Sequence, residues 1–236
     1  MSIQKNRGKE SNDDTLFGNE KMRSILRDAV EDLSHLLSRG YAQKSPLALG
    51  GNRYKLNVRQ QRAVQGMSAS AEQVERRKKN SVPVSALKGQ EVVIDGFNVL
   101  ILLESLLSDA YIFKGRDGFY RDLSSVHGSY KKVEQTSRAI ELIADFYVKE
   151  GIKSMHWYFD KPVSNSGKLK KIIEDMAAEN GYTWHVSLTF NPDKDIAVQN
   201  HVALTSDAWI LDNVSQNFNL IDYIAEKYPS QHIISC

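Results

Sequence analysis

Hydrophobic positions follow two different rhythms along the chain, and the change falls near residue 90. Within residues 19–89, apolar residues recur at steps of three and four, which predicts amphipathic helices. The clearest series consists of Met22, Ile25, Leu26, Ala29, Leu33, Leu36 and Leu37. Asn57 and Ser70 are of types that cap helix N-termini, so two shorter helices are expected to begin after them. We therefore predict a small, mainly helical domain over 19–89.

Beyond residue 90, short apolar runs alternate with amphipathic stretches, which is typical of strands joined by helical crossovers. Five strands are predicted, at 91–95, 155–160, 183–189, 201–205 and 231–235. Helical patterns lie between them, at 99–107, 133–149, 168–179, 196–200 and 219–227. The nearly continuous apolar runs VVID and WYFD favour a parallel sheet covered on both faces. We predict an α/β domain over 90–236, built on a parallel sheet of about five strands.

Two segments break these rhythms. Residues 1–18 are polar, without periodic apolar positions, and are expected to be a disordered tail. Residues 111–130 form a long insert in which two short apolar stretches flank a Lys-Gly-Arg-Asp-Gly turn, so a hairpin is expected. Loops of this length in compact domains are usually functional or disordered.

The composition is that of an ordinary globular protein, with 41% hydrophobic and 25% charged residues. No apolar run approaches the roughly 18 residues that span a membrane, and no apolar stretch follows the charges of the N-terminus. A soluble, cytoplasmic protein without membrane partners is expected. Cys236 is the single cysteine, so the sequence excludes an internal disulfide and a zinc cluster.

Charge is divided unevenly between the two parts. Residues 1–90 carry 17 Lys and Arg against 9 Asp and Glu, a net charge of +8, whereas the rest carry 14 against 20, a net charge of −6. Such a division suggests that one part holds a polyanion while the other holds cations. The alternative is that the basic helices are simply solvated, which is the commoner explanation of an isolated charge run.

Acidic residues follow four of the five predicted strands. Asp95 and Asp160 end the first two strands, Asp193 and Asp195 follow the third, and Asp207 follows the fourth. Each alone could be a turn or cap residue, but ligands of open parallel sheets bind beyond the carboxyl ends of the strands. Converging carboxylates repel each other unless a cation lies among them, and oxygen ligands select Mg²⁺ or Mn²⁺. This pattern predicts metal-assisted hydrolysis of a phosphodiester in nucleic acid.

Two segments resemble a known family. The Val92 to Asn98 segment, VVIDGFN, resembles the opening of the PIN-like nucleases, in particular their NYN branch, in which an Asp-Gly-aromatic-Asn turn follows the first strand. Leu204-Thr205-Ser206-Asp207 resembles the Thr-x-Asp element of that family. The resemblance covers about residues 91–236 and implies a PIN-like, Rossmannoid sheet of strand order 3-2-1-4-5. The whole layout, with the N-terminal segments LSRGYA and GNRYKLN, resembles a prokaryotic family of the DUF434 and DUF5616 type.

The resemblance also implies the roles of single residues. The implied catalytic residues and metal ligands are Asp95, Asp160, Asp195 and Asp207. Further metal ligands implied are Asp193 and Asp212. The supporting residues expected around them are Gly96, Asn98, Thr205 and Ser206, with Asn98 holding Asp95 through a local backbone bond. Glu104 could contribute from the first helix, but a solvent-facing position is expected. His156, His185 and His201 are expected to be structural.

Basic residues are the candidates for binding nucleic acid. In the N-terminal part they are Arg53, Lys55, Arg59 and Arg62. In the insert they are Lys114, Arg116, Arg121 and His127. Trp184 and Trp209 are expected in the core, although an exposed aromatic ring near the acidic edge could stack on a base.

Together these features predict a Mg²⁺- or Mn²⁺-dependent nuclease that acts on RNA. One alternative is a PIN-like protein that binds nucleic acid without cleaving it. A phosphatase on another α/β fold is a third hypothesis, which the absence of an Asp-x-Asp pair and of a Gly-rich phosphate loop disfavours. A monomer and a homodimer are both compatible with the sequence.

Overall fold

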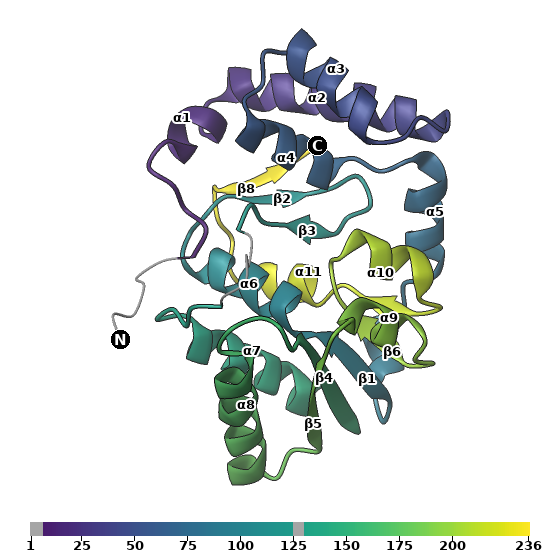
Figure 1. Cartoon of the computed structure of the whole chain (residues 1–236). Coiled ribbons are helices and arrows are strands. Elements are labelled where there is room, and N and C mark those ends of the chain that lie inside the picture. The colour runs from purple at the N-terminus through teal and green to yellow at the C-terminus, as the bar shows by residue number, and fades with distance from the viewer. Residues whose placement is uncertain (1–6, 125–129) are drawn as a thin grey trace.

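The computed structural model describes residues 7–124 and 130–236, and its centre is a parallel sheet (Figure 1). The strands of this sheet are β1 (Glu91–Asp95), β4 (Ser154–Asp160), β5 (Trp184–Thr189), β6 (Val202–Leu204) and β7 (Asn217–Phe218). They lie in the order β5-β4-β1-β6-β7, and every neighbouring pair is parallel. The predicted α/β class with a five-stranded parallel sheet is confirmed.

Helices cover the two faces of this sheet unequally. The side chains of Ile94, Trp157 and Phe159 belong to the main apolar core, which most of the longer helices cover. The helices that contribute to this core are α6 (Gly96–Leu107), α7 (Thr136–Lys149), α8 (Ser166–Asn180) and α11 (Leu220–Ala225). The opposite face has a smaller apolar cluster with two short helices, α9 (Pro192–Ala197) and α10 (Ala208–Asn213). Polar groups on that face therefore stay close to solvent.

The prediction for the fifth strand was wrong. Residues Ile233–Ser235 form β8, which pairs with β2 (Ile112–Lys114) in a second sheet, of order β3-β2-β8. The fifth position of the main sheet is held by β7, whose two residues are too few to produce an alternating pattern. The predicted hairpin is confirmed, because β2 pairs antiparallel with β3 (Tyr120–Arg121).

The N-terminal part is helical, as the periodicity predicts. Its elements are α1 (Asp13–Phe17), α2 (Glu20–Ser38), α3 (Lys44–Arg53), α4 (Val58–Met67), α5 (Ala71–Lys79) and a 3₁₀ turn, η1 (Val84–Leu87). Asn57 and Ser70 cap α4 and α5, each in a capping box. Figure 1 shows α4 next to the β3-β2-β8 sheet with α2 and α3 beyond it, and Phe113 and Ile234 of that sheet join the helices in one apolar cluster.

The expectation of a disordered tail over residues 1–18 fails for the part that the structure describes. From Arg7 onward the chain is held against the body of the protein, and both Phe17 and Asp13 are fully buried. The sequence shows no periodicity there because a single five-residue helix is too short to display it. None of the helices in the described part of the chain is long and apolar enough to cross a membrane.

Candidate functional site

Asp95 lies at the carboxyl end of the central strand, and α6 begins at the next residue. Only 8% of Asp95 is exposed. The turn is tight, because a Cβ atom on Gly96 would lie 2.2 Å from a ring carbon of Phe159. No larger residue fits at Gly96 without displacing that ring, so the predicted supporting role of Gly96 has a steric basis.

A short hydrogen-bond network connects Asp95 with the turn that follows β6. The Thr205 hydroxyl donates to Oδ2 of Asp95 (2.9 Å), and the backbone N–H of Asp207 donates to the Thr205 hydroxyl (3.0 Å). The side-chain oxygen of Asn98 accepts from the backbone N–H of Ser206 (2.8 Å). The Asn98 side chain therefore holds the neighbouring turn while its backbone bonds to Asp95, and the two turns are fixed relative to each other.

The electrostatics of the edge show that several of the acids lie near one another. Burial and, after it, the charge of Asp207 raise the pKa of Asp95 to about 8, against the lowering effect of the bond from Thr205. Burial also raises the pKa of Asp193, as do the charges of Asp207 and Asp160. The pKa of Asp160 is raised by burial. Asp95, Asp193 and Asp207 are therefore within electrostatic reach of one another, and Asp160 is within reach of Asp193.

The acids differ in how they are held. One oxygen of Asp207 accepts from the backbone N–H of Ile210 (2.9 Å) and so caps α10. Asp193 and Asp195 lie in the first turn of α9. Burial and, to a lesser extent, the charge of Asp195 raise the pKa of Tyr158 on the sheet face. The structure thus brings Asp95 and Asp207 together on adjacent strands, with Asp193 and Asp160 beside them.

The described residues contain no group of three or more His, Cys, Asp or Glu side chains placed to hold a metal ion. A preformed four-carboxylate centre is therefore absent from that part of the chain, contrary to the expected convergence on one point. The oxygen donors of a pair still suit Mg²⁺, which binds commonly through one or two carboxylates, water and substrate phosphates. Asp95 and Asp207 are the pair that fits this description.

A cleft of about 400 Å³ opens beside these turns. On the sheet side it is lined by Asn98, Ser206, Asp207 and Ala208. On the other side it is lined mainly by residues of the helical part and the hairpin, including Arg62, Gln65, Gly66, Gln73, Arg121 and Asp122. The cleft therefore brings basic and amide side chains opposite Asp207.

Ser206 is 1% exposed, and its hydroxyl has no hydrogen-bond partner among the described residues. Leaving a buried hydroxyl unpaired costs about 1–3 kcal/mol unless water or a ligand satisfies it. Ser206 lines the cleft next to Asp207. Its hydroxyl is a donor that a bound oxyanion could satisfy.

Asp212 does not belong to this site. Its carboxylate receives the Arg77 guanidinium at 2.8 Å on each oxygen and the Gln73 amide at 2.7 Å. Arg77 is 2% exposed and also pairs with Asp117 (2.6 Å). Both oxygens of Asp212 are thus occupied, which corrects its expected role as a metal ligand and gives it a structural one.

Several basic candidates are engaged in ion pairs. Arg59 is held by Asp13 and Glu10, and Lys114 by Asp222 at 2.6 Å. These pairings correct the expectation that Arg59 and Lys114 contact phosphates, since their charges are already compensated. Arg121 forms a bidentate pair with Asp117 but still lines the cleft.

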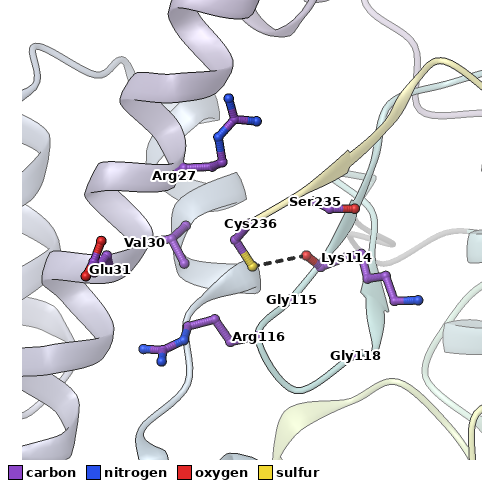
Figure 2. A pocket seen from close by; sticks show the side chains of 9 residues that line it. All are labelled: Arg27, Val30, Glu31, Lys114, Gly115, Arg116, Gly118, Ser235 and Cys236. Atoms are coloured by element: carbon purple, nitrogen blue, oxygen red, sulfur yellow. Dashed lines mark hydrogen bonds between the residues drawn. The ribbon is translucent and has the colours of Figure 1, made fainter.

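The remaining basic candidates are exposed. They are Arg53, Lys55, Arg62 and Arg116. Arg53 lies 3.3 Å from Asp32, whereas Arg62 lines the cleft. Arg116 lines a separate pocket of about 560 Å³, where Figure 2 shows it with Arg27, Glu31 and Cys236. That pocket contains none of the predicted acids, and His127 lies outside the described residues.

Three further residues differ from expectation. Glu104 is fully buried rather than solvent-facing, and it accepts from Arg7 (2.7 Å), Tyr130 and Thr136. Trp184 is buried as expected, but Trp209 is 45% exposed. Asp122, which the sequence did not single out, lines the cleft, and burial raises its pKa to about 6. The only sequence signal for Asp122 is its place in the polar insert.

Fold and site together define a class: an α/β protein whose parallel sheet carries an acidic pair at its carboxyl edge, opposite a helical basic part. The chain belongs to the family described as "Domain of unknown function (DUF5616)", whose model matches residues 84–223. Residues 25–80 match "Protein of unknown function (DUF434)". The chain is 32% identical over 201 residues to "Uncharacterized protein MJ0935" of Methanocaldococcus jannaschii, an alignment that covers 85% of this chain and 95% of the relative. No solved structure matches.

Proposed function

We propose that this protein is a PIN-like, Mg²⁺- or Mn²⁺-dependent nuclease that acts on RNA, with Asp95 and Asp207 as its cation ligands. The observation that carries the proposal is the position of this pair. After β1 the chain adds β4 and β5 along one edge of this strand, and it then returns to add β6 and β7 along the other edge. Asp95 and Asp207 follow β1 and β6, so they lie at the point where the strand order reverses. Open α/β sheets bind their ligands in the crevice at that point.

The energetics of Asp95 support the same conclusion. A buried carboxyl beside a second acid is costly to ionise, and its pKa is raised to about 8. Proteins retain such destabilising groups mainly where function needs them. Thr205 and Asn98 hold the two turns rigidly, as a site for a cation requires.

The strand arrangement supports the PIN-like part of the proposal. Counted along the chain, the strands of the main sheet run 3-2-1-4-5, with Asn217–Phe218 as the fifth. The resemblance of the VVIDGFN segment to the NYN branch implies the same order. Asp160 and Asp195 keep their proposed catalytic roles as further acids that follow strands of the same sheet.

A bound divalent cation would activate a water molecule and offset the charge of the phosphodiester. The protein's own contribution is positional. Thr205 orients Asp95, the backbone N–H of Ile210 fixes one oxygen of Asp207, and the Ser206 hydroxyl offers a donor toward the cleft. Arg62 on the opposite wall is placed to pair with a neighbouring phosphate.

The test is cleavage of labelled single-stranded RNA with Mn²⁺. Asp95→Asn and Asp207→Asn are each expected to reduce the rate by about 100-fold or more, because each removes a cation ligand. Asp175→Asn, an exposed change on α8, is the matched control and should cleave like the wild type. Equal rates in all four proteins would overturn the proposal.

One observation favours a second candidate, a protein that binds RNA without cleaving it. The described residues hold no preformed group of three metal-ligating side chains. This candidate requires salt-sensitive RNA binding in the presence of EDTA and no cleavage with any divalent cation.

A further inference from the structure

The exposed aromatic residues are unevenly distributed. Trp157 and Trp184 are buried at 0% and 6% exposure, whereas Trp209 is 45% exposed. Phe190 is 75% exposed. Leaving a large aromatic ring in water forgoes about 1.5–3 kcal/mol of burial, so an exposed pair on one edge calls for an explanation.

Both rings lie on the carboxyl edge of the main sheet. Phe190 directly follows β5, and Trp209 lies in the first turn of α10, two residues after Asp207. The strand order β5-β4-β1-β6 puts Asp95, at the end of β1, between the ends of β5 and β6, and Asp207 lies in the turn that leads to Trp209. Three strand spacings of about 4.8 Å separate the ends of β5 and β6, which is about 14 Å in total. The segments that carry the two aromatic rings therefore lie on either side of Asp95.

Trp209 is presented on a rigid support. Helix α10 buries Ile210 and Leu211, and Asp212 anchors it to Arg77. Ala208, the neighbour of Trp209, lines the cleft, so the first turn of α10 lies at the cleft. A ring held in this way loses little conformational entropy when a ligand stacks on it.

Phe190 has a cation beside it. The Lys161 ammonium lies 5.0 Å from the centre of the Phe190 ring, and the backbone N–H of Lys161 donates to the Thr189 carbonyl (2.7 Å). An aromatic ring next to an ammonium group suits one nucleotide, because the ring can stack on the base while the ammonium pairs with the phosphate.

We propose that Trp209 and Phe190 stack on the bases of a single-stranded nucleic acid that crosses the acidic edge. Charge favours this occupant over an apolar protein surface, because Lys161 lies beside the Phe190 ring and the exposed Arg62 lines the same cleft as Asp207 and Ala208. Stacking needs open base faces, which a duplex covers, so single strands should bind in preference to duplexes. The stacking does not depend on the proposed nuclease function. Only the cleavage of the bound strand between the two rings rests on that function.

The test is equilibrium binding in EDTA, where no cleavage occurs, of fluorescein-labelled oligouridine and of the same strand annealed to oligoadenine. Trp209→Ala and Phe190→Ala are each expected to weaken single-strand binding by about 5- to 100-fold, and Trp209→Phe by less. Val148→Ala removes another exposed apolar side chain, on α7, and is the matched control. Binding of the single strand should also quench the fluorescence of Trp209, because the other two tryptophans are buried.

The proposal is overturned if both alanine variants bind oligouridine like the wild type, or if the duplex binds as tightly as the single strand. It is also overturned if the wild type binds no RNA but self-associates through Trp209. If the wild type binds through Trp209 but does not cleave RNA with Mn²⁺, only the nuclease function fails. If the alanine variants bind RNA like the wild type and the wild type cleaves it, the stacking proposal is rejected and the nuclease function stands.

Discussion

At the scale of single residues, Asp95 combines a structural cost with a functional position. Its carboxyl is almost completely buried and lies near Asp207, so ionisation is unfavourable and its pKa rises from 3.8 to about 8. Between these two pH values the folded protein holds a proton on Asp95 that the unfolded chain has released. The free energy of unfolding contributed by Asp95 therefore falls as pH rises from about 4 to about 8.

Asp95→Asn removes that cost. The variant is expected to gain stability relative to the wild type as pH rises from 5 to 8, by at least about 1 kcal/mol, or about 2–4 °C in Tm. Thermal unfolding in EDTA at the two pH values measures the difference, with Asp175→Asn as control. Mg²⁺ should raise the Tm of the wild type but not of Asp95→Asn. A Tm difference that does not change with pH would contradict this account.

At the scale of elements, Arg77 joins three segments that are distant in the chain. It lies on α5 and pairs with Asp117 in the hairpin turn and with Asp212 on α10. The same pairings fix two walls of the cleft, because Gln73, Arg121 and Ala208 line it. The hairpin insert thus serves to connect the helical part with the acidic edge.

Arg77→Met keeps most of the side-chain volume but leaves two carboxylates without their shared cation. Breaking a buried ion pair on one side costs about 3–5 kcal/mol, and a loss in this range is expected in urea unfolding. The control is Arg76→Met, whose exposed pair with Glu72 is worth less than about 1 kcal/mol. Equal losses for the two variants would show that Arg77 is not a structural anchor.

At the scale of the whole molecule, the basic part and the acidic part meet at the cleft. Arg62 is the exposed cation of α4 that lines it, whereas Arg53 lies outside the cleft, near Asp32. An RNA strand held at the acidic edge should therefore depend on Arg62 more than on Arg53. This distinguishes the cleft from the outer surface of the helices.

Arg62→Ala is expected to weaken RNA binding for all sequences alike and to reduce the slope of log affinity against log salt by about 1, because one phosphate contact is lost. Arg53→Ala, with the same change of charge, should leave both quantities nearly unchanged. Binding titrations over a series of salt concentrations measure them. If Arg53→Ala weakened RNA binding more than Arg62→Ala, the RNA would bind to the outer face of the helical part instead of the cleft.

The sequence by itself determined the features that depend on neighbours along the chain. The periodicity of residues 22–37, the caps at Asn57 and Ser70, the hairpin and four strands of the sheet follow from local backbone geometry, which a few residues specify. The acids at the strand ends follow from the same reasoning.

Only the tertiary structure decided which charged and aromatic groups are free. Asp212 is paired with Arg77 across 135 positions, Arg59 with Asp13 across 46, and Lys114 with Asp222 across 108. Residue type cannot distinguish a paired carboxylate from a free one, since both look alike in the sequence. The exposure of Trp209 depends in the same way on how α10 packs, because burial is set by contacts with distant segments.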